Sequence, residues 1–212
     1  MFQHVPNALT AARLLLAVVF FGMLSYYQHD GRGDPVLLNS AFVVYAVALF
    51  TDFLDGYLAR KWNVEGAFGR VVDPFVDKVL VLGTFIFFSG KNFVIQQYVQ
   101  HASVVTTISG VAPWMVVLIL ARELLVTSLR GIAESSGQSF GAQFSGKLKM
   151  VFQSVTILVI LIYINYFERA GGNVEHAGRI GRDICIWLTI GITVFSGFTY
   201  TRRAIDLYRK AN

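Results

Sequence analysis

Two stretches of the sequence contain no charged side chain: residues 150–167, MVFQSVTILVILIYINYF, and residues 184–201, ICIWLTIGITVFSGFTYT. A helix needs roughly 20 mainly apolar residues to cross the hydrocarbon core of a bilayer. Residues 35–51 are also uncharged, and residues 8–28 carry a single charge, on Arg13. These four stretches therefore predict helices that span a membrane.

Two further stretches are predicted to span the membrane although they carry charge. Residues 111–129 are apolar apart from Arg122 and Glu123. Residues 79–90 are apolar but number only 12, so a complete span has to extend back to Asp73. That extension puts carboxylates on a membrane helix, where ionisable groups are costly and usually serve a function. The sequence thus predicts an all-α integral membrane protein with six transmembrane helices.

The composition agrees with a membrane protein and excludes several other classes. Of the 212 residues, 55% are hydrophobic and only 15% are charged, whereas about 25% charge is usual in soluble domains. Too few charged side chains remain to coat a soluble surface, which excludes a disordered chain, a coiled coil and an ordinary soluble globule. The net charge of +5 suits loops that face an anionic lipid surface. No repeat or linker divides the sequence, so we expect a single membrane domain over residues 1–212.

The basic residues predict how the helices are oriented. Six spans put both termini on one side of the membrane, and lysine and arginine concentrate on the cytoplasmic side of membrane proteins. Of the 18 basic residues, the side that carries both termini holds 13: Arg13, Arg60, Lys61, Arg70, Lys78, Arg122, Arg130, Lys147, Lys149, Arg202, Arg203, Arg209 and Lys210. We therefore expect a multi-pass protein of the cell inner (cytoplasmic) membrane with both termini in the cytoplasm.

Glycine-rich segments are predicted to connect some of the spans. Residues 29–35, HDGRGDP, and residues 169–182, RAGGNVEHAGRIGR, have the composition of loops. Residues 91–110 are more polar than the spans, and we expect a short interfacial helix there before the fourth span.

Four aspartates gather at the expected cytoplasmic ends of the second and third spans. They lie in DFLDGYLAR, residues 52–60, and GRVVDPFVD, residues 69–77. Helical residues three, four or seven positions apart share one face, so the acids of each segment are expected to share a face. Two helices joined by a short turn can direct these faces towards each other. Small residues beside the acids allow a bulky ligand to approach the backbone: Gly56, Ala59 and Gly69.

Four carboxylates in one pocket of low dielectric repel one another, and divalent cations relieve that repulsion. Oxygen donors without His or Cys suit Mg²⁺ or Mn²⁺ rather than Zn²⁺, and four aspartates suit two ions, as in two-metal phosphoryl transfer. Such ions usually complete their coordination with substrate phosphate, and Arg60 adds a positive charge for it. The sequence therefore predicts a cytoplasmic-face active site between the second and third helices and their neighbours.

The pattern D-x-x-D-G-x-x-A-R-x8-G-x-x-x-D-x-x-x-D over residues 52–77 resembles the signature of the CDP-alcohol phosphatidyltransferase family at every fixed position. The resemblance implies a six-helix membrane enzyme, usually a homodimer, that uses divalent metal and an acceptor hydroxyl to displace CMP from a CDP-alcohol. It implies that metal is held by Asp52, Asp55, Asp73 and Asp77, with Asp77 also the general base. It implies a CDP site that comprises Asp52, Asp55, Gly56, Ala59, Arg60, Gly69 and Asp73.

The flanking sequence resembles the bacterial phosphatidylglycerophosphate synthases within that family. The shared features are PNALTAAR at residues 6–13, ARELLVTSLR at residues 121–130 and GKLK at residues 146–149. The resemblance implies transfer of a phosphatidyl group from CDP-diacylglycerol to sn-glycerol 3-phosphate, which gives phosphatidylglycerophosphate and CMP in phospholipid biosynthesis. Arginine and lysine are the usual partners of a phosphomonoester, and the candidates for the acceptor phosphate are Arg13, Arg122, Arg130, Lys147 and Lys149.

Other acceptors and one other class of protein stay open. Inositol phosphate also offers a phosphomonoester and a hydroxyl, and phosphatidylglycerol as acceptor would give cardiolipin by the same chemistry. Glu65 and Val76 replace residue types that many such synthases carry, which leaves the acceptor open. A membrane cation transporter would also place acids on its helices, although near the midplane and in two repeated halves. No covalent nucleophile is evident, so direct displacement with sequential kinetics is expected, without a nucleic-acid partner.

Overall fold

The structure is a computed structural model. It describes the backbone of residues 5–29, 31, 33–62, 67–95, 107–135 and 144–211. The side chains are described over the same ranges except at residues 5–7, 55–62, 67–74, 134, 144–145 and 207–211. Within these ranges the only β-structure is an isolated bridge between Val94 and Thr107.

Six helices of 19 to 40 residues make up most of the described chain. They are α1 (Val5–Tyr26), α2 (Pro35–Trp62), α3 (Ala67–Phe88), α5 (Pro113–Ser135), α6 (Phe144–Ile162) and α8 (Gly172–Ala211). The short 3-10 helix η2 (Lys91–Phe93) follows α3, and the π-helical turn η3 (Tyr163–Phe167) with α7 (Glu168–Ala170) joins α6 to α8. The expectation of an all-α protein is confirmed for the described residues.

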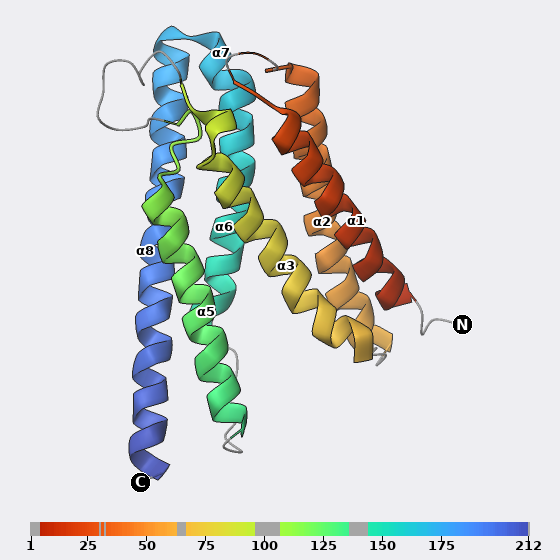
Figure 1. Cartoon of the computed structure of the whole chain (residues 1–212), viewed down its shortest axis with the longest axis vertical. Helices are drawn as coiled ribbons and strands as arrows, with labels where there is room; N and C mark the ends of the chain where they lie inside the picture. Colours follow the sequence, from red (N-terminus) through yellow and green to blue (C-terminus); the bar gives the residue numbers. More distant parts are fainter. Residues whose placement is uncertain are drawn as a thin grey trace.

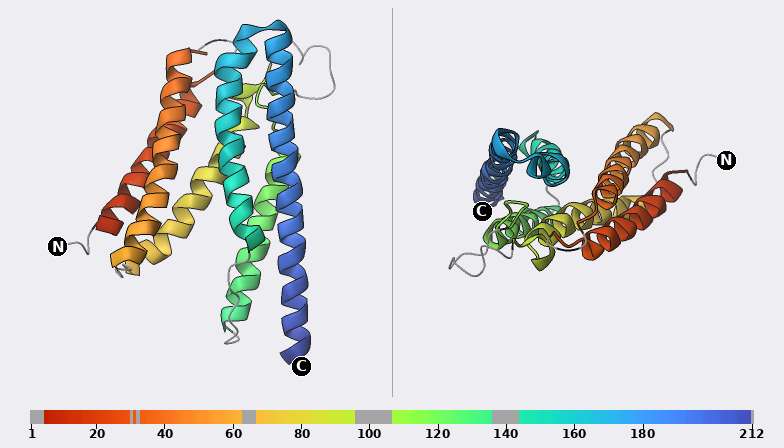
Figure 2. Two further views of the ribbon diagram at one scale, coloured as in Figure 1. Left: turned by 180° about the vertical axis from the view of Figure 1, so that it is seen from behind. Right: turned by 90° about the horizontal axis from the view of Figure 1, so that it is seen from above.

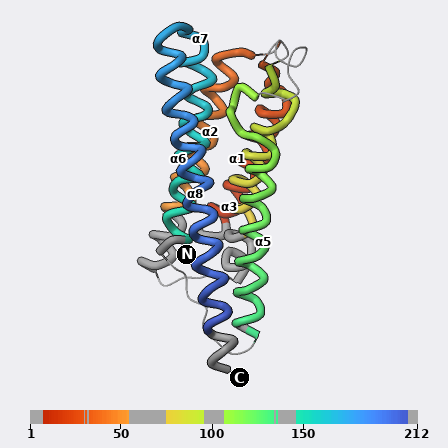
Figure 3. The backbone as a smooth tube through the Cα atoms, turned by 90° about the vertical axis from the view of Figure 1, so that its left-hand side faces the viewer, coloured from red at the N-terminus to blue at the C-terminus, as the bar shows by residue number. Residues whose placement is uncertain are grey.

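The long helices run alternately up and down (Figure 1). The view from above shows two rows, with α1, α3 and α5 in one row and α2, α6 and α8 in the other (Figure 2). Helices α1 and α2 pack together, as do α6 and α8, and α5 lies along α8 (Figure 3). The start of α1, the end of α2 and the end of α8 therefore lie towards the same end of the molecule, the lower end in Figure 1.

Some apolar side chains form an aromatic interior, and others form an apolar outer surface. Phe20 on α1 and Tyr45 on α2 are fully buried, and their ring centroids lie 5.2 Å apart. Towards the upper end, Phe88 and Phe93 pack edge to face at 5.3 Å. By contrast, large apolar side chains such as Leu15, at 68% exposure, face outwards, which is expected of helices surrounded by lipid.

Four of the described helices are long and apolar enough to cross a membrane by length and composition. These segments are Ala8–Tyr26, Pro35–Leu54, Gly146–Ala170 and Gly172–Asp206. The chain is therefore a helical, membrane-embedded protein. Helices α3 and α5, which carry the charges noted in the sequence, run beside these four (Figure 1).

The expectation that residues 169–182 form a connecting loop is wrong, because the chain is helical again from Gly172 onwards. Among the glycines of this segment, Gly171 and Gly172 adopt positive φ, at 66° and 58°, and this single turn reverses the chain. Gly178 lies inside α8, where a Cβ atom would come within 2.5 Å of the Phe167 side chain. This glycine therefore allows close packing against η3, which composition alone does not distinguish from a loop glycine.

Arg182 holds the same part of α8 in place. Its guanidinium donates to the carbonyl of Ile108 at 2.6 Å and to Asp183 at 2.7 Å, and it lies over the Tyr163 ring at 4.5 Å. These contacts join α8 to the segment before α5 and to η3. Tertiary contacts of this kind stabilise a helix that has several glycines.

Gly83 provides a test of the packing between α1 and α3. A Cβ atom at Gly83 would lie 2.5 Å from Cζ of Phe21, and Phe21 is itself stacked on Phe87 at 5.5 Å. We expect Gly83→Ala to lower the free energy of unfolding by about 1–3 kcal/mol, as overpacking does. Gly22→Ala on α1 is the matched control because nothing lies within 4 Å of its Cβ position. Thermal unfolding in detergent measures both, and equal stability of the two variants would contradict the contact.

Candidate functional site

Arg13 joins the first three helices at the level of the aspartate motif. Its Nη1 lies 2.9 Å from Oδ1 of Asp52 on α2 and 3.2 Å from Oδ1 of Asp77 on α3. The Arg13 side chain is 1% exposed, whereas Asp52 and Asp77 are 41% and 21% exposed. A buried guanidinium is tolerated only where carboxylates compensate it. One nitrogen of α1 therefore draws a carboxylate of α2 and one of α3 together.

The other side chains of the signature lie outside the described residues. Their backbone belongs to α2 or α3, but nothing is assigned to the side chains of Asp55, Gly56, Ala59, Arg60, Gly69 and Asp73. Among the described side chains, no group of three or more His, Cys, Asp or Glu could hold a metal ion. The described part of the motif is thus the pair Asp52 and Asp77, whose oxygens meet at a single positive nitrogen.

A cavity of about 510 Å³ lies between α3, α5, α6 and α8, and we call it the basic cavity. Asp77 is part of its wall, so the cavity adjoins the aspartate motif. Its basic lining residues are Lys78, Arg122, Arg130, Lys147 and Lys149, and its acidic ones are Asp77 and Glu123. With five basic and two acidic side chains, the lining is positive in balance and favours an anionic ligand.

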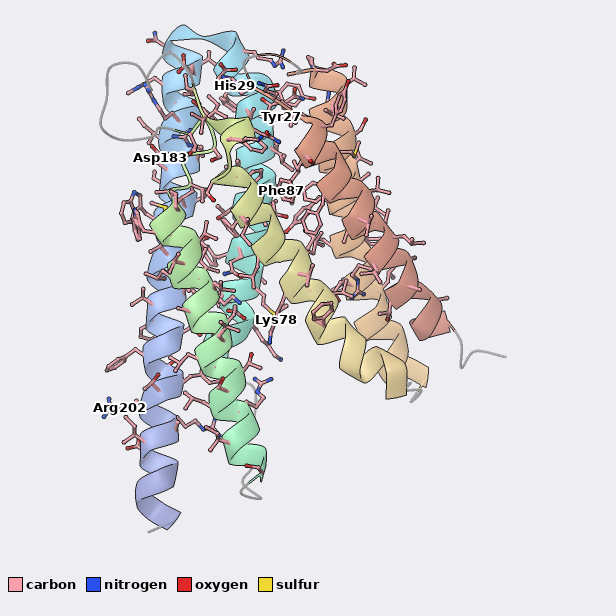
Figure 4. All side chains as sticks on the ribbon, viewed as in Figure 1. Tyr27, His29, Lys78, Phe87, Asp183 and Arg202 are labelled. Carbon is pink, nitrogen blue, oxygen red and sulfur yellow. The ribbon has the colours of Figure 1, made fainter. Side chains whose placement is uncertain are left out.

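Four of the five candidates for the acceptor phosphate thus line one cavity. The fifth, Arg13, lies instead between the two aspartates. Lys78, which was not a candidate, also lines the cavity and donates to Oγ1 of Thr127 at 2.7 Å; it projects from α3 towards α5 (Figure 4).

Glu123 organises the inner wall of the basic cavity. Its Oε1 accepts from Nη1 of Arg122 at 2.9 Å and from Nζ of Lys149 at 2.5 Å. Arg122 also donates to Ser196 at 2.5 Å and lies over the Tyr200 ring at 5.4 Å. Glu123, Arg122 and Lys149 are all less than 9% exposed. The one negative charge of Glu123 therefore compensates only one of the two buried positive charges.

Arg130 and Lys147 are more accessible than this inner group. Lys147 is exposed and Arg130 is partly exposed, and neither forms an ion pair within the described part of the chain. Their charge is therefore more available to a phosphate than that of Arg122 or Lys149.

Several contributors to the site were not singled out from the sequence. Ser196 and Tyr200 on α8 were assigned only to a span, and Gln153 on α6 was one polar residue in an apolar run. A signal existed for Gln153, because it follows Lys149 by four positions and therefore shares its helix face. No signal of that kind connects α8 with Arg122, since their contact is tertiary.

The sequence matches the CDP-alcohol phosphatidyltransferase family over residues 3–195, and the chain belongs to that family. It is 29% identical to the CDP-diacylglycerol–glycerol-3-phosphate 3-phosphatidyltransferase of Bacillus subtilis, over 99% of each chain. A protein of the same name from Rickettsia bellii is 28% identical over 93% of each chain. A "Probable phosphatidylglycerophosphate synthase" of Mycobacterium tuberculosis is 31% identical over 95% of this chain and 82% of that protein.

The shared carboxylate of Glu123 gives a prediction for stability. We expect Glu123→Gln to lower the free energy of unfolding by about 3–5 kcal/mol, because it leaves two buried cations uncompensated. The double variant Glu123→Gln/Lys149→Met should recover part of that loss, since it removes one of the two cations. Chemical unfolding in detergent measures both changes.

Asp206→Asn is the control, because Asp206 is exposed on α8 and a surface substitution changes stability by about 0.5 kcal/mol or less. If Glu123→Gln were as stable as Asp206→Asn, the buried ion-pair network would be refuted.

Proposed function

We propose that the protein transfers a phosphatidyl group from CDP-diacylglycerol to sn-glycerol 3-phosphate, which yields phosphatidylglycerophosphate and CMP. The observation that carries this proposal is the basic cavity, whose wall includes both Asp77 of the family signature and the cations Arg130 and Lys147. A small acceptor that carries a phosphomonoester fits such a cavity by charge. The names of the Bacillus and Rickettsia relatives support the same donor and acceptor.

Within this reaction the basic residues bind and orient the acceptor. Arg130 and Lys147 are proposed as the first partners of its phosphate, because they are accessible and form no ion pair among the described residues. Arg122 and Lys149 would add positive potential from the inner wall, where Glu123 fixes their positions. Arg13 stays a candidate, although its described partners are carboxylates.

Asp77 is proposed as the general base. It stands in the wall of the basic cavity and also faces α1 and α2 through Arg13, so it adjoins both the acceptor and the metal site. As the terminal hydroxyl oxygen of the acceptor forms its bond to the phosphorus of the phosphatidyl group, Asp77 takes the hydroxyl proton. The bond between that phosphorus and CMP breaks in the same displacement, without an enzyme-bound intermediate.

Members of this family use divalent metal ions, and two described carboxylates are suited to help hold one. Oδ1 of Asp52 and Oδ1 of Asp77 come from different helices and already share one positive nitrogen, and oxygen donors suit Mg²⁺ or Mn²⁺. We propose that Asp52, Asp55, Asp73 and Asp77 hold two ions. When bound, the metal would neutralise diphosphate charge and make CMP a better leaving group.

The remaining signature residues are proposed to bind the donor. Asp52, Asp55 and Asp73 would reach the diphosphate through metal, Arg60 would contact phosphate directly, and the small residues would leave room for the nucleotide: Gly56, Ala59 and Gly69.

We further propose the membrane arrangement that the basic residues predict. All six long helices would span the cell inner membrane as one domain over residues 1–212, with both termini and the site in the cytoplasm. The alternating helix directions support this arrangement, since the start of α1, the end of α2 and the end of α8 lie towards one end of the described molecule (Figure 1). A homodimer is proposed from the family resemblance.

The acceptor is tested by CMP release from CDP-diacylglycerol by the purified protein with Mg²⁺ or Mn²⁺. We expect release with sn-glycerol 3-phosphate and at least a roughly 10³-fold loss in kcat for Asp77→Asn, which removes the proposed base and a metal ligand. Release only with inositol phosphate or phosphatidylglycerol would change the acceptor. No release with any acceptor would refute the transferase and favour the cation transporter, and a trapped phosphatidyl-enzyme would refute direct displacement.

The metal site has a test that does not depend on activity. We expect Mn²⁺ binding, measured by electron paramagnetic resonance, to weaken by at least about 10-fold in Asp52→Asn and Asp77→Asn, because each loses a charged oxygen ligand. Asp206→Asn keeps all four signature aspartates and should bind Mn²⁺ as the wild type does. Unchanged binding in both site variants would exclude Asp52 and Asp77 as ligands.

A further inference from the structure

Gln153 is a deeply buried polar residue in the wall of the basic cavity. It projects from α6, is 1% exposed and belongs to the cavity lining. Its amide nitrogen Nε2 has no hydrogen-bond partner among the described residues. A buried amide donor without a partner is costly, so this side chain requires an explanation.

The neighbouring buried polar residue of the same helix is satisfied within the protein. Thr156 lies three positions after Gln153 and is fully buried. Its hydroxyl shares a hydrogen bond of 2.8 Å with Thr189 and lies 3.1 Å from the carbonyl of Cys185. The α6–α8 interface thus pairs its own hydroxyls, and the unpartnered amide is found where α6 faces the cavity instead.

The positions on α6 define a direction within the basic cavity. Lys147 is exposed, Lys149 is 5% exposed and Gln153 is 1% exposed. Gln153 follows Lys147 by six positions, a distance of roughly 9 Å along the helix axis. Charge therefore surrounds the accessible part of the cavity, and a neutral amide lies further in.

The rest of the lining is apolar, as at Leu82 and Met150, or carries a hydroxyl. The hydroxyl of Thr127 is bonded to Lys78 and to the Glu123 carbonyl. Among the neutral side chains of this lining, Gln153 is the one with a buried atom that has no partner within the described residues.

An amide NH₂ group suits the oxygen of a hydroxyl. Among the polar groups of sn-glycerol 3-phosphate, the phosphate is matched by the cations of the cavity, and the terminal hydroxyl has to give its proton to Asp77. The secondary hydroxyl is the group that remains, and its oxygen can accept from Nε2. In a site that binds a hydroxyl through a buried polar group, an analogue without the hydroxyl leaves that group unpaired.

We propose that Gln153 determines acceptor specificity by donating a hydrogen bond from its side-chain amide to the secondary hydroxyl of sn-glycerol 3-phosphate. This inference rests on the proposed function, because the hydroxyl belongs to that acceptor. It adds a neutral recognition group to the charged residues that bind the phosphate.

The first experiment compares two acceptors with the wild-type protein. 3-Hydroxypropyl phosphate has the terminal hydroxyl and the phosphate of glycerol 3-phosphate but lacks the secondary hydroxyl. We expect its kcat/KM, measured by CMP release, to be about 10- to 100-fold lower, since it leaves the Gln153 amide unsatisfied. Equal kcat/KM values for the two acceptors would overturn the proposal without any variant being made.

The second experiment assigns that discrimination to Gln153. Gln153→Met is similar in volume and has no donor, and we expect a loss of about 3- to 10-fold in kcat/KM for glycerol 3-phosphate. The ratio between the two acceptors should fall to within about 3-fold of unity, while KM for CDP-diacylglycerol should change by less than about 2-fold. Gln153→Leu provides a second apolar variant if the first does not fold.

Thr156→Val is the matched control, since Thr156 is buried on the same helix but bonded within the protein. It should lower stability and keep the wild-type ratio between acceptors. Retention of that ratio by Gln153→Met, or its loss in Thr156→Val, would overturn the role of Gln153. A wild-type protein that ignores glycerol 3-phosphate but releases CMP with another acceptor would refute the proposed function itself, an outcome distinct from both of these.

Discussion

The guanidinium of Arg13 is almost completely buried, and a buried positive charge needs carboxylates close to it. Asp52 and Asp77 supply them at 2.9 Å and 3.2 Å. Because Arg13 belongs to α1, Asp52 to α2 and Asp77 to α3, this contact fixes three helices relative to one another at the level of the signature. The two acids, which would repel each other if left alone, are held close enough to share a cation.

A second buried charge group fixes the other half of the molecule. Glu123 on α5 binds Arg122 and also Lys149 on α6, while Arg122 reaches Ser196 on α8. The two charge groups meet at the basic cavity, whose wall runs from Asp77 to Arg122 and Lys149. A buried charge needs a partner in the protein or in a ligand, and the positive balance of this cavity favours an anion.

The sequence was a good guide to the helices and a poorer guide to their ends. Uncharged runs such as residues 150–167 predicted helices because a bilayer leaves few other structures possible. The segment at residues 169–182 was predicted to be a loop because glycine usually interrupts helices, yet Gly178 is helical and packs against Phe167. A glycine that permits close packing and a glycine that ends a helix look the same in a sequence.

For the site, the sequence by itself indicated the chemistry through two features: aspartates and small residues at helical spacing, and basic residues at the matching ends of the predicted spans. These follow from local spacing and from the cost of charge in lipid. Only the tertiary structure decided which charges meet. It separated Arg13 from Arg122, Arg130, Lys147 and Lys149 and put Glu123 between two of them. It also placed Gln153 in the wall of a cavity. Contacts between distant segments depend on how the helices cross, and the sequence of a single helix does not reveal that.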